Sequence, residues 1–149
     1  MMKAIVLFSL VWVICSCDKN NTYKDYEEDT FYFPDKVLNI AVKPDTKSFC
    51  IQGRLEKVSR DIDKYFIRVV PGLTTAENGI QYQLPKELLE LFFKFPVDSV
   101  VSELVVPVFP EKIDRPVKIV FTSLGKIVNK DYTRYNDTLT VNLLPQPVE

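Results

Sequence analysis

The amino-acid sequence predicts an all-β fold, an antiparallel β-sandwich of seven or eight strands. Short segments in which apolar and polar residues alternate recur from residue 31 onward. Such alternation turns one face of a strand toward a core and the other toward water. Turn-forming residues, Asn78-Gly79 among them, separate the segments. Many short strands punctuated by turns are typical of a sandwich, and residues 31–149 are enough for one domain with a workable core.

The first half of this body contains four segments with a strand pattern, namely 31–33, 38–42, 48–55 and 64–70. In the third segment, Phe49, Ile51 and Leu55 share one face. Gly53 interrupts that face and is a candidate for a β-bulge. The fourth segment is short, aromatic and β-branched, which favours a strand.

The second half repeats the alternation in three segments, namely 104–108, 117–122 and 139–143. Pro107 predicts an edge strand or a bulge, because proline cannot donate a hydrogen bond to a neighbouring strand. Ile80 and Tyr82 follow the turn at Asn78-Gly79 and predict one more short strand. Residues 127–136 predict a long surface connection.

One segment, residues 85–95 (PKELLELFFKF), fits two structures. Pro85 suits a first helical turn, and the apolar residues after it recur at helical spacing. Leu91, Phe93 and Phe95 fit a strand equally well. We expect a helical turn followed by a strand.

The N-terminus has the features of an export signal. A basic start at Lys3 precedes 12 nearly unbroken apolar residues, Ala4 to Cys15. That run is too short to cross a bilayer, which needs about 20 helical residues. The run ends in Ile14-Cys15-Ser16-Cys17, which resembles the lipobox of bacterial lipoproteins. The sequence therefore predicts a lipoprotein signal peptide over residues 1–16 and acylation of Cys17.

The predicted cleavage defines the mature chain and the place where we expect it. Removing 16 residues from 149 leaves 133, and losing Lys3 leaves 18 basic against 20 acidic residues, a formal charge of −2. Several acyl chains on Cys17 would give a stable membrane anchor. Residues 17–30 are polar, charged and poor in aliphatic residues, which predicts a flexible tether. We expect a lipoprotein of the cell envelope, held at the outer membrane on its periplasmic or surface face.

Composition excludes several classes of function. The charge is near neutral and the basic residues form no stripe, which argues against nucleic-acid binding. The sequence has no histidine, which excludes Ser-His-Asp, Cys-His and His-ligated zinc mechanisms. We expect no catalytic residues, no cofactor and no metal.

Cysteine usage predicts no intramolecular disulfide. Cys15 would leave with the signal and Cys17 would be blocked by lipid, so Cys50 has no partner. Cys50 lies inside a strand-like segment, and we expect it to be buried as a small hydrophobic residue.

Several runs resemble a group of small Bacteroidetes-type lipoproteins of uncharacterised function, which are similar in turn to the immunoglobulin-like Calx-beta domain. An alanine, a glycine and a tyrosine follow a strand, here Ala76, Gly79 and Tyr82. A strand ending in Phe-x-Phe and a tight turn come next, and then a strand of alternating valines; this sequence has them at 93–95 and 102–109. The runs that carry the resemblance are Ile51–Arg54, Asp61–Lys64, Ile67–Val70 and Thr74–Tyr82.

The resemblance implies an immunoglobulin-like sandwich and an extracytoplasmic lipoprotein without assigned catalytic residues. Calx-beta modules bind calcium through clustered acids after the valine-rich strand. The matching region here, residues 110–116, sets Glu111 and Asp114 beside Lys112 and Arg115. Two acids facing two bases are a poor cage for an ion that takes 6–8 oxygen ligands. The chain also lacks the late tryptophan of the lipoprotein group, since its one tryptophan is Trp12.

Two kinds of candidate site remain. Tyr132, Arg134 and Tyr135 lie together in the predicted surface connection and could bind a partner, because exposed tyrosines stack on sugars and proteins. Asp98-Ser99-Val100 and Asp137-Thr138-Leu139 resemble a three-residue O-glycosylation signal, which makes Ser99 and Thr138 candidate modification sites.

Three functions stay open. The first is a lipid-anchored, non-catalytic binding module for a glycan or another envelope protein. The second is a calcium-stabilised structural module. The third is a small hydrolase with two acids about 5–9.5 Å apart across a cleft.

Overall fold

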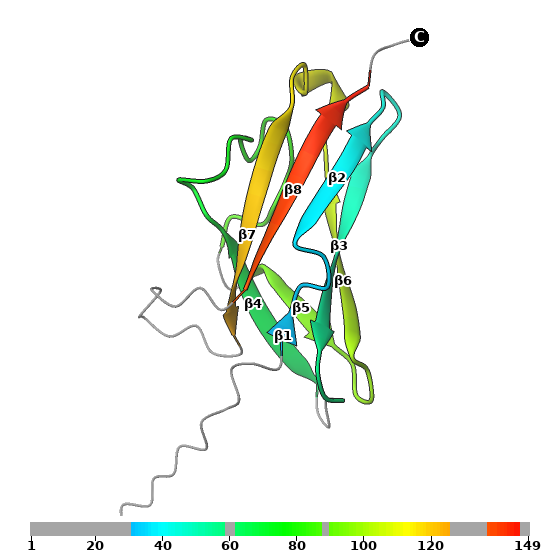
Figure 1. The fold of residues 1–149 in the computed structure, drawn as a ribbon, viewed down its shortest axis with the longest axis vertical. Helices are drawn as coiled ribbons and strands as arrows, with labels where there is room; N and C mark the ends of the chain where they lie inside the picture. The colour runs from blue at the N-terminus through cyan, green and yellow to red at the C-terminus, as the bar shows by residue number, and fades with distance from the viewer. Residues whose placement is uncertain (1–30, 59–61, 88–89, 126–136, 147–149) are drawn as a thin grey trace, which may run out of the picture.

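A computed structural model of the chain describes residues 31–58, 62–87, 90–125 and 137–146. Two sheets pack face to face, as Figure 1 shows. One sheet has three strands in the order β1-β3-β6, and the other has five in the order β2-β8-β7-β4-β5. The predicted all-β sandwich is confirmed, with eight strands among the described residues.

The strands follow the predicted segments closely. They are β1 (Phe31–Tyr32), β2 (Val37–Val42), β3 (Ser48–Leu55), β4 (Asp63–Val69), β5 (Phe92–Phe95), β6 (Val101–Pro107), β7 (Val117–Gly125) and β8 (Thr138–Pro145). A single-turn 3-10 helix, η3 (Pro110–Lys112), joins β6 to β7. Strand β6 is an edge strand, as Pro107 predicted.

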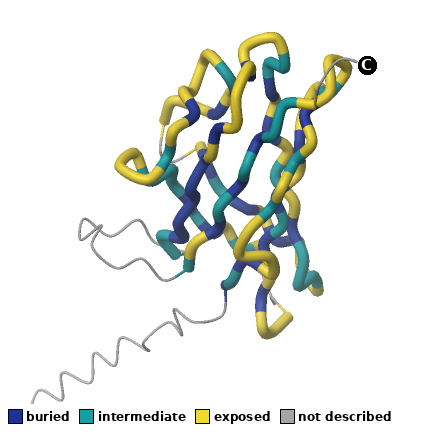
Figure 2. Tube along the Cα trace, turned by 45° about the horizontal axis from the view of Figure 1, so that its top comes forward, coloured by how far each residue is buried: buried dark blue, intermediate teal, exposed yellow. Residues whose placement is uncertain are grey.

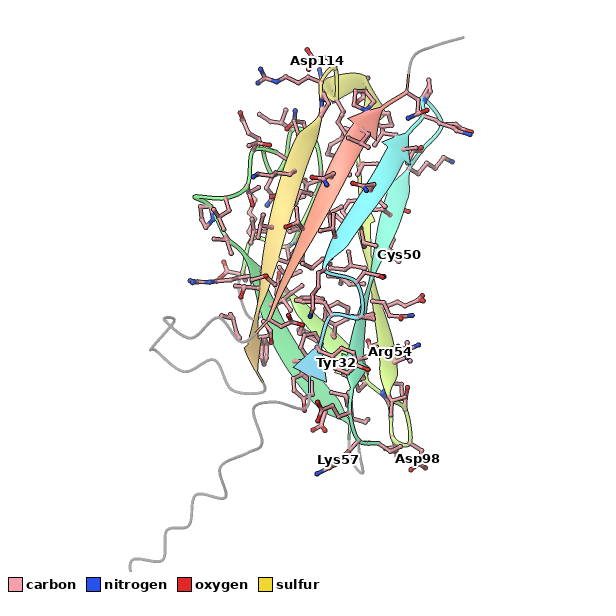
Figure 3. All side chains as sticks on the ribbon, in the orientation of Figure 1. Tyr32, Cys50, Arg54, Lys57, Asp98 and Asp114 are labelled. Atoms are coloured by element: carbon pink, nitrogen blue, oxygen red, sulfur yellow. The ribbon has the colours of Figure 1, made fainter. Side chains whose placement is uncertain are left out.

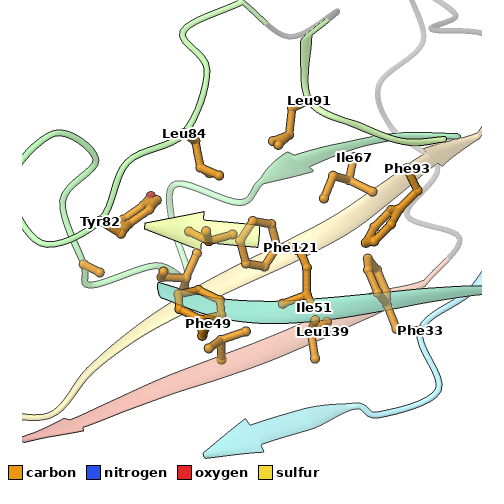
Figure 4. Packing of buried hydrophobic residues seen from close by; sticks show 14 of the residues in the cluster. Phe33, Phe49, Ile51, Ile67, Tyr82, Leu84, Leu91, Phe93, Phe121 and Leu139 are labelled. Carbon is orange, nitrogen blue, oxygen red and sulfur yellow. The ribbon is translucent and has the colours of Figure 1, made fainter. Parts of the chain in front are cut away.

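The core lies between the sheets and consists of inward strand residues together with residues of the connections, such as Phe33, Tyr82 and Leu84. Burial alternates along the strands (Figure 2), and in β3 and β8 the apolar residues face inward. The largest fully buried side chains come from both sheets and from the β1–β2 connection, among them Phe33, Ile51, Phe93, Phe121 and Leu139 (Figure 4).

The N-terminal strands cross from one sheet to the other. β1 pairs antiparallel with β3, whereas β2 pairs with β8 in parallel, over the six positions from Val37↔Thr140 to Val42↔Pro145. This parallel pairing departs from the otherwise antiparallel sandwich. Residues 33–36 therefore carry the chain from an edge strand of the three-stranded sheet to an edge strand of the five-stranded sheet.

Asp137 fixes this crossover. Its carboxylate accepts hydrogen bonds from the Phe33 N–H at 2.7 Å and from the Lys36 ammonium group at 2.6 Å. It also accepts the N–H of Thr138 at 3.0 Å. The Asp137 side chain is 16% exposed, so water screens this ion pair less than it would a fully exposed one.

Gly53 is not a β-bulge. The register between β3 and β6 runs unbroken through Gly53↔Ser102. A Cβ atom at this position would lie 2.6 Å from Cε2 of Phe31. The glycine is therefore required because an aromatic ring from β1 lies directly against its Cα. A register shift does occur between β4 and β7, at Phe66/Ile67.

Three other expectations meet different outcomes. Ile80 and Tyr82 form no strand: Ile80 is 49% exposed, and Tyr82 makes only isolated bridges, to Asn78 and Val108. Cys50 is exposed, because it points away from the face that Phe49 and Ile51 bury. In the 85–95 segment, the Glu90 N–H donates to the Glu87 carbonyl in a one-turn pattern, and the predicted strand follows as β5.

Replacing Gly53 with alanine should destabilise the fold. The new methyl group would push the Phe31 ring into its packed neighbours, and overpacking of this kind costs about 1–3 kcal/mol. Urea unfolding measures the loss. Gly72→Ala is the matched control, since nothing lies within 4 Å of a Cβ there. Equal stability of the two variants would contradict the close-approach explanation.

Replacing Asp137 with alanine should also destabilise the domain, by about 1–3 kcal/mol, because the Phe33 N–H loses its charged acceptor. Thermal unfolding of Asp137→Ala and of Asp114→Ala, an exposed acid in the β6–β7 connection, makes the comparison. Asp114→Ala should change stability by no more than about 0.5 kcal/mol.

Candidate functional site

A pocket of about 400 Å³ lies beside the end of β4, where the chain leaves the sheet for the long segment that leads to β5. Its walls come from Arg68 and Val69 of β4 and from the segment 71–91. This volume falls within the range of small-molecule sites in proteins. Figure 1 shows the segment as the green loops that stand beside β7.

Hydrogen bonds to β7 fix the first part of this segment. The hydroxyl oxygens of Thr74 and Thr75 accept the backbone N–H groups of Val120 and Lys118, each at 2.9 Å. The N–H groups of Thr75 and Ala76 donate to the Lys118 carbonyl in return. The two threonines thus satisfy the backbone of β7 beyond the point where its pairing with β4 ends.

A tight turn fixes the middle of the segment. The side-chain oxygen of Asn78 accepts the Leu84 N–H at 2.8 Å, and the Gly79 N–H donates to the Tyr82 carbonyl at 2.7 Å. Gly79 has φ +84, a conformation that glycine adopts without strain. The turn therefore directs the Tyr82 ring inward, against Leu84 and the core (Figure 4).

Tyr82 is the most distinctive polar group of the pocket. Its side chain is 2% exposed and lines the pocket. Burial raises the pKa of Tyr82 above its ordinary value of 10.0, because the protein surroundings disfavour the charged phenolate. The hydroxyl is therefore a protonated donor at neutral pH.

The rest of the lining is largely apolar, with a few charges. Leu84, Pro85 and Leu91 contribute hydrophobic surface, while Arg68 and Lys86 contribute positive charge. Among the described residues that line the pocket, Glu87 is the single acid. An apolar wall with a few polar groups suits reversible binding of a small ligand.

The acidic residues offer little support for metal chemistry. Among the described residues, no three His, Cys, Asp or Glu side chains gather closely enough to hold a metal ion. The segment that matches the calcium region of Calx-beta domains contains η3, with Glu111 and Asp114 both exposed. In Figure 3, Asp114 lies at the upper end of the molecule, far from Lys57 and Asp98 at the lower end.

The structure describes only some of the site residues that the sequence predicts. Cys17, Tyr132, Arg134 and Tyr135 lie outside the described residues, and their roles stay predictions. Ser99 is half-buried, and its hydroxyl donates to the Val101 carbonyl at 2.9 Å. Thr138, by contrast, is exposed at the start of β8.

Sequence reasoning missed this pocket, although two signals for it were present. Residues 71–79 break the alternation of apolar and polar residues, which marks a long excursion between strands. Tyr82 lies within the long segment between β4 and β5, and its bulk alone favours a strand.

Comparisons with known proteins identify the fold alone. No protein-family model and no curated protein sequence matches the chain. Among solved structures, CBD12 from CALX1.2 superposes with a TM-score of 0.56 at 12% identity, covering 78% of this chain and 44% of the other. The apo-form Calx CBD1 domain gives 0.53 at 11% identity, covering 78% of this chain and 96% of that domain.

A candidate carbohydrate-binding protein from Bacteroides ovatus is also similar, with a TM-score of 0.51 at 12% identity over 78% of this chain and 37% of the other. The chain thus spans less than half the length of CBD12 and of this protein. The class that these neighbours define is an immunoglobulin-like β-sandwich of the Calx-beta type. Within the described residues, no helix is long and apolar enough to cross a membrane.

The raised pKa of Tyr82 predicts a loss of stability at alkaline pH. The folded state holds the phenol proton more tightly than the unfolded chain, so its stability falls as the pH rises past 10.0. Tyr82→Phe removes this group and should lose less stability over the same interval. Melting temperatures of both proteins below and above pH 10.0 test this difference. Parallel declines would show that Tyr82 is not the group responsible.

Proposed function

We propose that the chain is a lipid-anchored cell-envelope lipoprotein that acts as a non-catalytic binding module, with its ligand in the pocket beside β4. The observation that carries this proposal is the pocket of about 400 Å³, in which the Tyr82 side chain lies among apolar residues and a few charged ones. A concave, mostly apolar site with a few polar groups is the usual form of a small-ligand site.

We infer that the ligand is a short glycan segment. Sugar rings present hydroxyl groups that accept hydrogen bonds and C–H faces that pack on apolar surface. Tyr82 and Lys86 supply donors, and Leu84, Pro85 and Leu91 supply the apolar wall. The similarity to a candidate carbohydrate-binding protein concerns the fold, and is compatible with this ligand class.

The alternative functions have less support. A carboxylate-pair hydrolase needs two acids across a cleft, and Glu87 is the single acid among the described residues that line this pocket. A calcium-stabilised module needs clustered oxygen ligands, and the described residues contain no such cluster.

Substitutions in the pocket should weaken glycan binding without unfolding the protein. Tyr82→Phe removes one hydroxyl and should lower the affinity about 2–10-fold, the value of one neutral hydrogen bond. Lys86→Ala should lower it similarly. A glycan array identifies a ligand, and titration calorimetry compares the variants.

Lys43→Ala is the control, since this exposed lysine lies between β2 and β3, outside the pocket lining. Equal binding by all variants would exclude the pocket as the glycan site. If the chain binds no glycan but binds a purified envelope protein, its ligand is a protein and not a glycan.

Lipid attachment is tested separately. In bacteria grown with labelled palmitate, the unmodified protein should incorporate label and sediment with membranes. Cys17→Ser should incorporate none, because the oxygen of serine does not replace the thiol that is acylated. Cys50→Ser is the matched control and should retain the label. Label that persists in Cys17→Ser would exclude Cys17 as the anchor.

A further inference from the structure

Two connections lie next to each other at one end of the sandwich. The first joins β3 to β4, and the second is the β5–β6 turn at residues 96–100. The Leu55 N–H donates to the Val100 carbonyl at 3.0 Å, and Asp63 pairs with Phe95, so both ends of the two connections meet. Figure 3 shows Lys57 and Asp98, one from each connection, both at the lower end of the molecule.

This end displays exposed aliphatic side chains. Val58 is 52% exposed, Ile62 is 59% exposed and Val97 is 51% exposed. Single exposed aliphatics are ordinary on protein surfaces, but here three from two adjacent connections share one end. We refer to Val58, Ile62 and Val97 as the apolar tip.

The charges near the apolar tip are of both signs. Arg54, Lys57, Lys64 and Lys94 are exposed in the adjoining strands and connection, against exposed Glu56 and Asp98 and half-buried Asp63. Lys64 pairs directly opposite Lys94, and its ammonium lies 4.7 Å from the centre of the Phe92 ring. Lys64 extends toward Phe92, at the end of β5 away from the tip, whereas the Lys94 stem is long enough for its charged end to reach toward lipid headgroups.

The N-terminal segment enters the domain at the same end. Phe31, the first described residue, pairs with Leu55, the last residue of β3. The 13 residues from Asp18 to Thr30 separate it from Cys17. Fully extended, they span at most about 45 Å. An anchor at Cys17 would therefore allow the apolar tip, which lies at the end where the chain enters, to reach the bilayer.

We propose that the apolar tip inserts into the lipid interface of the membrane that holds the anchor. This inference rests on the proposed acylation of Cys17. Burial of Val58, Ile62 and Val97 among headgroups and upper acyl chains removes their apolar surface from water, as in interfacial membrane proteins. The domain would then stand with the apolar tip on the bilayer.

The mature chain offers a clean optical test, because Trp12 lies in the predicted signal and residues 17–149 contain no other tryptophan. Val97→Trp places one tryptophan at the tip, and Leu73→Trp places one in the pocket segment, where Leu73 is 55% exposed. Each acylated protein is reconstituted into vesicles of phosphatidylethanolamine and phosphatidylglycerol with or without brominated acyl chains. Flotation confirms anchoring before fluorescence is measured.

Tryptophan 97 should emit at shorter wavelength in vesicles than in detergent-free buffer, and brominated lipid should quench most of its emission. Tryptophan at position 73 should remain unquenched. If both proteins float but the two tryptophans are quenched equally, or neither is quenched, the insertion of the apolar tip is wrong, while the lipid anchor still holds. Failure to float would overturn the anchor and the inference with it. Val58→Trp provides a second probe if circular dichroism shows that Val97→Trp is misfolded.

Discussion

The packing of Phe31 is the interaction on which the sandwich depends. Its ring lies within 5.3–6.1 Å of Phe33, Tyr65, Phe93 and Phe95, in stacked, tilted and edge-to-face arrangements. Aromatic pairs of this kind contribute about 0.5–1.5 kcal/mol each beyond simple burial. The ring has room because residue 53, beneath it, has no side chain. One residue from the shortest strand thereby joins the two sheets at the end where the chain enters.

The arrangement of the strands also accounts for the pocket beside β4. Strands β4 and β5 are neighbours in the sheet, but the chain travels from residue 70 to 91 before it returns. The threonine hydroxyls hold that excursion against β7, and the Asn78 amide oxygen holds the turn within it, so a rigid scaffold positions the pocket residues. Strand β4 is seven residues long, which places the pocket about 20 Å from the apolar tip. Membrane contact and ligand binding can therefore occur at the same time.

Local pattern predicted most of the strands, because one face of each is covered by core and the other by water. Strand β8 is an example, since its leucines and valine alternate with polar residues. Long-range features escaped prediction. Gly53 would suit a bulge or a close ring equally well, and the ring that decides between them comes from Phe31, 22 positions earlier. The parallel pairing of β2 with β8 joins distant segments. Tyr82 has the bulk of a strand residue, but the hydrogen bonds of Asn78 and Gly79 place it in a turn.

The crossover of the N-terminal strands between sheets has a mechanical consequence. A load between a bound ligand and a lipid-held N-terminus would pull on Phe31 along the strand direction. The two residues of β1 would peel first, after which the Lys36–Asp137 ion pair would bear the force. Behind it, the six paired positions of β2 and β8 would be sheared together, and rupture in shear breaks many bonds at once. The pairing of β2 with β8 would thus resist extension from the N-terminal end.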